Sequence, residues 1–208
     1  MSSLIAKSSG GSSITPLDEG VYVGICTWLI DLGEQRNQKF DKVSHRVIFM
    51  WDIVGETVRI NDKEESRTMN REYTLSLHER SGLRKDLQAW RGKAFTDEEL
   101  EGFDVANVLG VPCQIQIVHE ERNGSTYARI GSIMAMPKGQ PKPNKDDYAL
   151  HVFDFGAPET WSTYAELPQW IKDKVKAAEN YSGSKLEEFV LSSDYSDVED
   201  ADEDQLPF

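Results

Sequence analysis

Stretches of alternating apolar and polar residues, interrupted once by a helical pattern, constrain this fold more than any other feature of the sequence. Residues 20–32 are rich in β-branched and aromatic side chains and predict a long first strand, in which Gly24 permits a bend or bulge. Residues 33–41 are polar and predict a loop. A second strand follows, because one apolar face repeats every two residues and contains Val47, Phe49, Trp51 and Ile53.

Three more strands are predicted by the same period of two. Residues 71–77 alternate after a polar stretch, and residues 111–118 alternate again further along the chain. The pair Asn123-Gly124 favours a tight turn from the fourth strand into a fifth, over residues 127–133. The fourth and fifth strands are therefore expected to form a hairpin.

A helical period separates the third strand from the fourth. Ser81 suits the N-cap of a helix, and Gly92 suits its end. A second helical start lies at Thr96, which forms a capping box with Glu99 three residues later. The apolar face of the first helix consists of Leu83, Leu87 and Trp90.

The resulting order, β-β-β-α-β-β, is that of the OB-fold, a five-stranded barrel. We therefore expect a mainly β protein with a helical insert, whose OB-fold domain spans residues 17–137. Residues 1–16 are rich in serine and glycine and predict a flexible arm. Residues 138–182 combine a linker of proline and lysine with a helix that begins at Pro168 and docks on the barrel. Residues 183–208 are expected to form a disordered acidic tail.

Charge is distributed unevenly along the chain. The net charge is −13, and residues 194–208 supply about half of it through seven acids and no base. The remaining body is mildly acidic, which argues against duplex-DNA binding by a broad basic surface, because phosphate neutralisation supplies most non-specific affinity. Any nucleic-acid site is therefore expected to be a local groove.

The sequence favours a non-enzymatic, cytoplasmic protein. Cys26 and Cys113 lie in apolar, strand-like stretches, which favours reduced buried thiols over a disulfide. The four histidines lack metal-ligand spacing, and the chain has no glycine-rich phosphate loop or nucleophile elbow, so we expect no metal, no cofactor and no catalysis. No apolar run is long enough to cross a bilayer, and the first residues lack the apolar core of a secretory signal.

Aromatic rings and cations gather where a single strand of nucleic acid would need them. Single-strand binders stack bases on rings and direct lysine and arginine at phosphates. The candidates lie in the loop before the second strand, on the third strand, in the last hairpin and in the linker: Trp28, Arg36, Lys39, Phe40, Lys42, Arg46, Arg71, Tyr73, Tyr127, Arg129 and Lys138. A solvated turn is the alternative for the loop, and packing is the alternative for the hairpin. Core packing is favoured for Tyr73, and also for Phe49 and Trp51.

The acidic tail ends in an apolar tip with a free carboxylate. Dense charge of one sign normally marks only a solvated end. An apolar tip on an acidic leash, however, suits a partner with an apolar pocket surrounded by arginine and lysine. The residues expected to bind such a partner are Asp202, Glu203, Asp204, Leu206, Pro207 and Phe208.

The final residues, Asp202-Glu-Asp-Gln-Leu-Pro-Phe, resemble the acidic C-terminal peptide of bacterial and phage single-stranded DNA-binding proteins. The body resembles a group of phage proteins with a predicted OB-fold in residues 31–35, 83–93 and 109–113, so the resemblance extends over about residues 20–208. Two features depart from the bacterial pattern: Gln205-Leu206 interrupts the acids, and the helical insert is large. Neither tetramer formation nor individual DNA contacts are therefore carried over.

The resemblance implies protection of exposed single-stranded DNA in replication or recombination, with capture of nucleases, polymerases or helicases by the tail tip. Two other functions stay open. One is a protein-interaction adaptor or virion component whose barrel binds no nucleic acid, which the mildly acidic body favours. The other is an OB module that binds RNA, which reads the 2′-hydroxyl. The choice between monomer and dimer also stays open.

Overall fold

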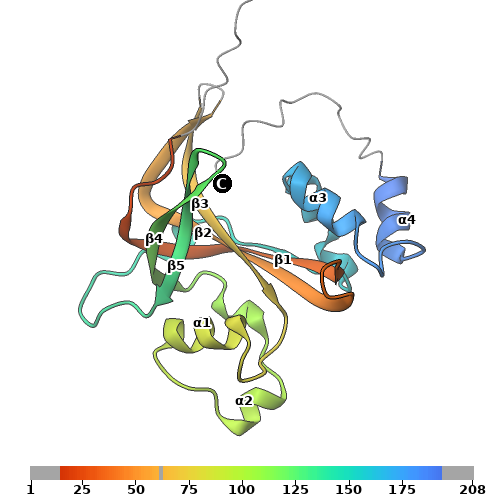
Figure 1. The fold of residues 1–208 in the computed structure, drawn as a ribbon, viewed down its shortest axis with the longest axis horizontal. Coiled ribbons are helices and arrows are strands. Elements are labelled where there is room, and N and C mark those ends of the chain that lie inside the picture. The colour runs from red at the N-terminus through yellow and green to blue at the C-terminus, as the bar shows by residue number, and fades with distance from the viewer. Residues whose placement is uncertain (1–14, 61–62, 194–208) are drawn as a thin grey trace, which may run out of the picture.

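The computed structural model describes residues 15–60 and 63–193, and this part of the chain is mainly β (Figure 1). Five strands follow the order β3-β2-β1-β4-β5 in one open sheet with antiparallel neighbours, and a short sixth strand pairs with β1 in parallel. The strands are β1 (Gly20–Asn37), β2 (Lys42–Ile60), β3 (Lys63–Thr74), β4 (Pro112–Arg122), β5 (Ser125–Met134) and β6 (His151–Phe153).

Helices lie in two groups. Between β3 and β4 the structure has α1 (Gly82–Arg91), α2 (Asp97–Glu101) and the 3-10 helix η1 (Val105–Val108). After β5 it has η2 (Lys145–Asp147), η3 (Pro158–Glu166), α3 (Gln169–Lys176) and α4 (Lys185–Ser192). The predicted order of three strands, a helical insert and two strands is confirmed. The closed five-stranded barrel is not shown, because β3 and β5 are the edges of the sheet and form no ladder with each other among the described residues.

The helical insert begins and ends as its sequence predicts. The Ser81 side chain accepts a hydrogen bond from the Arg84 backbone amide at 3.4 Å, and Gly92 is left-handed with φ of 68°. The predicted apolar face of α1 is buried, and its Trp90 Nε1 donates to the Pro112 carbonyl of β4 at 3.1 Å. The capping box of Thr96 and Glu99 is present at the start of α2.

The loop predicted over residues 33–41 is wrong. β1 continues to Asn37, which pairs with Lys42 in β2, so only a short turn separates the two strands. The polar residues at the end of β1 pair with β2 and also contact the C-terminal segment. The Glu34 carbonyl accepts a hydrogen bond from the Glu179 amide at 2.8 Å, and the Glu34 amide donates to Asn180 Oδ1 at 2.9 Å.

The third strand also lies earlier than predicted. β2 and β3 form a long hairpin through residues 54–60 and 63–68, whose side chains are all exposed or partly exposed, in keeping with its polar character. Leu75 and Leu77 lie beyond the end of β3, and Leu75 is 40% exposed, so it does not share the buried face of Tyr73.

Gly24 allows a close approach and forms no bulge. A Cβ at this position would lie 2.5 Å from Ile115 Cδ1 of β4, so the glycine admits that side chain into the core. The register shifts of β1 fall elsewhere, between Cys26 and Trp28 and between Asp31 and Glu34.

The middle parts of β1 and β2 are buried on both faces. The predicted face of β2, including Phe49 and Trp51, lies in one core with α1 and the β4–β5 hairpin, which confirms the packing roles of these rings. The opposite face contributes Ile48 and Met50 to a second core, which we call the outer core. The outer core is covered by η3, α3 and α4, which lie together on one side of the sheet in Figure 1. Its other main members are Ile30, Leu32, Phe153, Tyr164, Ile171, Val175, Leu186 and Val190.

One boundary differs from the prediction. The first part of the tail expected from residue 183 is folded, because α4 occupies Lys185–Ser192 and buries Leu186 and Val190 in the outer core. The tail tip, residues 202–208, and most of the expected N-terminal arm lie outside the described residues.

Cys26 and Cys113 are both free and buried, which confirms the prediction of reduced thiols. Burial raises the pKa of each thiol. Among the helices of the described residues, none has the length and apolar character needed to span a bilayer.

Candidate nucleic-acid interface

The two edges of the sheet, β3 and β5, approach each other, and Arg71 bridges them. Its Nη1 donates to Asp86 Oδ2 of α1 at 2.7 Å, and its Nη2 donates to the Ile130 carbonyl of β5. The Tyr73 hydroxyl donates to the same carboxylate oxygen at 2.8 Å. We call this gap between β3 and β5 the seam. Arg71 and Tyr73 connect the β3 side of the seam to α1.

Tyr73 is unavailable for base stacking in this arrangement. Its side chain is buried, its ring packs edge-on against Phe49 at 5.3 Å, and burial raises the pKa of its hydroxyl. The favoured packing interpretation of Tyr73 therefore agrees with its surroundings, and Arg71 is engaged by protein groups at two of its nitrogens.

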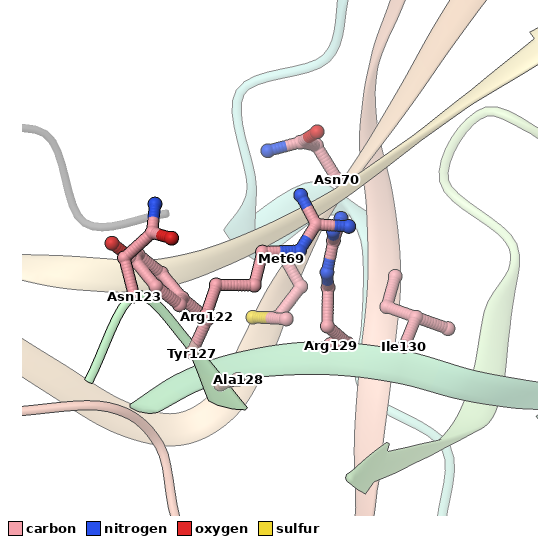
Figure 2. A pocket seen from close by; sticks show the side chains of 8 residues that line it. All are labelled: Met69, Asn70, Arg122, Asn123, Tyr127, Ala128, Arg129 and Ile130. Atoms are coloured by element: carbon pink, nitrogen blue, oxygen red, sulfur yellow. The ribbon is translucent and has the colours of Figure 1, made fainter. Parts of the chain in front are cut away.

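A hollow of about 400 Å³ opens in the seam beside this bridge (Figure 2). We call it the seam hollow. It lies between β3 and the β4–β5 hairpin and is lined by Met69, Asn70, Arg122, Asn123, Tyr127, Ala128, Arg129 and Ile130.

The hairpin turn decides which side chains meet in the seam hollow. Asn123 and Gly124 both have positive φ, 49° and 78°, as a two-residue type I′ turn requires. The turn pairs Glu120 with Tyr127, so residues two positions away on each strand, Arg122 and Arg129, lie on the same face. Tyr127 is 41% exposed and presents part of its ring to solvent.

One carboxylate orients both arginines of the seam hollow. Glu120 Oε1 accepts from Arg122 Nε at 2.6 Å, and its Oε2 accepts from Arg129 Nε at 2.7 Å. The hydrogen bonds from Arg122 and Arg129 lower the pKa of Glu120, which is therefore ionised at neutral pH. Two cations and one anion leave a net positive charge, and Figure 2 shows both guanidinium groups reaching from the hairpin towards β3.

A second hollow, of about 600 Å³, lies at the connection from β3 to α1, and we call it the β3–α1 groove. Three cations line it, Lys42, Arg46 and Arg80, and Glu72 is the one acid among its described lining residues. Its other lining residues are Tyr73, Thr74, Ser76, His78, Ser81, Gly82 and Leu83.

Glu72 is held by two cations from different parts of the chain. Its Oε1 accepts from Arg46 Nε at 2.8 Å, and its Oε2 accepts from Lys174 Nζ of α3 at 2.5 Å. Burial opposes ionisation of Glu72, but Lys174 and Arg46 together outweigh that effect and lower its pKa. Arg46 Nη1 also donates to Thr74 Oγ1 at 2.8 Å.

The remaining predicted residues lie apart from both hollows. Trp28 stacks on His151 with ring centroids 4.0 Å apart, and Arg36 forms ion pairs of 2.6 Å with Asp41 and Glu179. Near the turn between β1 and β2, Phe40 is 70% exposed, with Lys39 Nζ 5.5 Å from its ring centroid. Lys138 is exposed in the segment after β5.

The structure therefore divides the predicted candidates. Tyr127 and Arg129 meet in the seam hollow, and Lys42 and Arg46 meet in the β3–α1 groove. Sequence reasoning missed Asn70, Arg122, Asn123 and Arg80. The pairing across Asn123-Gly124 would have identified Arg122, because a two-residue turn puts it on the face of Tyr127.

No group of three or more histidine, cysteine or acidic side chains suited to a metal ion occurs within residues 15–60 and 63–193. Compared with models of known protein families and with the sequences of curated proteins, the chain matches none.

Proposed function

We propose that this protein binds single-stranded DNA, with the seam hollow as the place where a base and its phosphate are held. The observation that carries the proposal is the seam hollow itself, in which a partly exposed tyrosine ring lies beside two arginines on a protein whose net charge is −13. Rings and cations side by side are what single-strand binding uses.

The chemistry of the seam hollow suits a single strand better than a duplex. An unpaired base offers its face to the Tyr127 ring, whereas stacking inside a duplex hides that face. The guanidinium groups of Arg122 and Arg129 suit a phosphate, and the side-chain amides of Asn70 and Asn123 suit base edges or sugar oxygens. Because the body of the protein is mildly acidic and its cations gather only in local hollows, binding should be local.

The strand order supports an OB-type barrel as the framework of this site. A helical insert lies between β3 and β4, and the β4–β5 hairpin turns back towards β3, where OB-folds bind oligonucleotides. In this proposal Arg71 replaces the missing ladder between β3 and β5.

The proposed role is protection of single-stranded DNA in the cytoplasm during replication or recombination, with partner proteins recruited by the tail. Support for recruitment comes from the sequence: acids followed by Leu206-Pro207-Phe208. Removing residues 194–208 should abolish binding to such a partner and leave the folded body intact.

The test is a titration of fluorescently labelled oligo-dT, followed by anisotropy over a range of salt concentrations. Tyr127→Ala should weaken binding about 5- to 150-fold, because stacking contributes about 1–3 kcal/mol per base. Tyr127→Phe is the matched control and should bind as the wild type does, since it keeps the ring. Equal affinities for all three proteins would contradict the assignment of the seam hollow.

The alternative is a protein-interaction adaptor, which the mildly acidic body favours. An adaptor should show no salt-dependent binding to any oligonucleotide. Matched ribo- and deoxyribo-oligomers in the same titration separate a DNA binder from an RNA binder, because only RNA has the 2′-hydroxyl.

A further inference from the structure

We propose that the β3–α1 groove is a second phosphate-binding site for the strand held in the seam hollow, and that Lys174 of α3 keeps this groove cationic. The inference rests on the proposed function. It adds a second site, the class of group that the site takes, and a role for the C-terminal helices.

Both hollows lie along one strand. Met69 and Asn70 line the seam hollow, and Glu72 to Thr74 line the groove, with only Arg71 between them. At about 3.3 Å per residue, Asn70 and Thr74 are about 13 Å apart along β3. An extended nucleic-acid strand that follows β3 would therefore pass from one hollow into the other across the Arg71 bridge.

The groove is better suited to phosphates than to bases. Lys42 and Arg80 are exposed, and they form no ion pair with the described residues. Two rings lie among its described lining residues: Tyr73 is buried and packed against Phe49, whereas the smaller imidazole of His78 is exposed. Contacts from its cations to phosphates would position the strand and carry no sequence information.

Glu72 is the feature that would work against a phosphate in the groove. Alone, its carboxylate would neutralise Arg46, to which it is bonded at 2.8 Å. Lys174 contacts the other carboxylate oxygen at 2.5 Å, so the three groups together carry one positive charge. Because the Lys174 carbonyl accepts a hydrogen bond from Gln35 Nε2 at 2.8 Å, β1 fixes this residue beside the groove. Lys174 is therefore a positioning residue: it acts through Glu72.

The first experiment compares two lengths of oligo-dT, about 4 and about 16 nucleotides, which span the site sizes of OB-folds. In the Lys42→Ala/Arg80→Ala protein, the slope of log affinity against log salt for the long oligomer should become shallower by about 1.4, because each lost phosphate contact removes about 0.7. The slope for the short oligomer should change less, since it reaches fewer of these contacts. Lys185→Ala is the control, because Lys185 is exposed at the start of α4.

The outcomes separate the two proposals. No binding of either oligomer to the wild type would overturn both the proposed function and the second site. Binding that depends on Tyr127 but keeps its salt slope in the Lys42→Ala/Arg80→Ala protein would overturn the second site alone. Circular dichroism and thermal melting of each variant show whether it is folded.

The second experiment tests the role of Lys174. Lys174→Ala should make the salt slope for the long oligomer shallower by about 0.7, as for one lost contact. Lys174→Ala/Glu72→Gln should return the slope and affinity to the wild-type values, because the acid that Lys174 balances is gone. A double variant as weak as Lys174→Ala would overturn the role through Glu72, since a lysine that binds DNA itself, or only supports the fold, cannot be rescued in this way.

Discussion

Replacing Arg71 by alanine should loosen the seam and destabilise the whole fold. The Arg71–Asp86 pair has side-chain exposures of 27% and 16%. Without Arg71, the Asp86 carboxylate keeps only its hydrogen bond from the Tyr73 hydroxyl, and the Ile130 carbonyl loses the hydrogen bond from Arg71. Breaking a fully buried pair costs about 3–5 kcal/mol, whereas an exposed pair contributes at most about 1 kcal/mol. For this partly buried pair we expect a loss of about 2–3 kcal/mol.

Urea unfolding followed by tryptophan fluorescence measures this loss as a change in the free energy of unfolding. The melting temperature should fall by about 4–12 °C, since a chain of this size loses about 2–4 °C per kcal/mol. Arg36→Ala is the matched control, because Arg36 also forms two short contacts, to Asp41 and Glu179, but on the exposed surface. Its loss should be clearly smaller than that of Arg71→Ala, because exposed ion pairs contribute little.

Two results would refute this reasoning. If Arg71→Ala destabilised the protein no more than Arg36→Ala, the bridge across the seam would carry little energy. If Arg71→Ala weakened oligo-dT binding while the free energy of unfolding stayed at its wild-type value, Arg71 would be the phosphate ligand that the sequence alone predicts.

Two further perturbations have signs that follow from the structure. His45 Nε2 lies 2.6 Å from Asp31 Oδ1, and this hydrogen bond raises the pKa of His45. The pair therefore stabilises the fold fully below the ordinary histidine pKa and loses its effect as pH rises through the raised value. His45→Gln should accordingly lower the free energy of unfolding at acidic pH and converge with the wild type at alkaline pH, and a difference that grows with pH would contradict this. Gly24→Ala places a methyl group 2.5 Å from Ile115 Cδ1 and should cost about 1–3 kcal/mol in urea unfolding, whereas Gly102→Ala, which meets nothing within 4 Å, serves as its control; similar losses would refute the close-packing argument.

Local chemistry made part of this fold predictable. The N-cap at Ser81, the capping box at Thr96 and the turn at Asn123-Gly124 each satisfy backbone groups within a few residues, so their sequence signals are complete in themselves. The buried face of β2 was equally predictable, because every second residue of the strand is apolar and packs in one core.

Long-range contacts explain what sequence reasoning missed. The end of β1 is polar because Glu34 and Gln35 bond to residues about 140 positions later in the chain, so it resembled a loop. Ile48 and Met50 alternate with the inner face of β2, and no local pattern shows that helices after residue 157 cover them. β6 is only three residues long, which is too short to show an alternation of apolar and polar residues.

The candidate site was predictable to the same extent. Tyr127 and Arg129 flank a recognisable turn and do meet in a hollow. Arg71 and Tyr73 have the cation and the ring that single-strand binding needs, but both are hydrogen-bonded to Asp86 of α1. The sequence does not show this contact, because it depends on how α1 packs against β3.

The outer core determines how far the C-terminus can be shortened before the protein fails to fold. A fragment that ended near residue 137, just after β5, would leave Ile30, Leu32, Ile48 and Met50 facing water as one apolar surface. Such a surface promotes aggregation, so a shortened protein must extend through α4 to about Ser193. The C-terminal helices are thus part of the same folding unit as the sheet, and the sheet cannot be separated from them without exposing its second face.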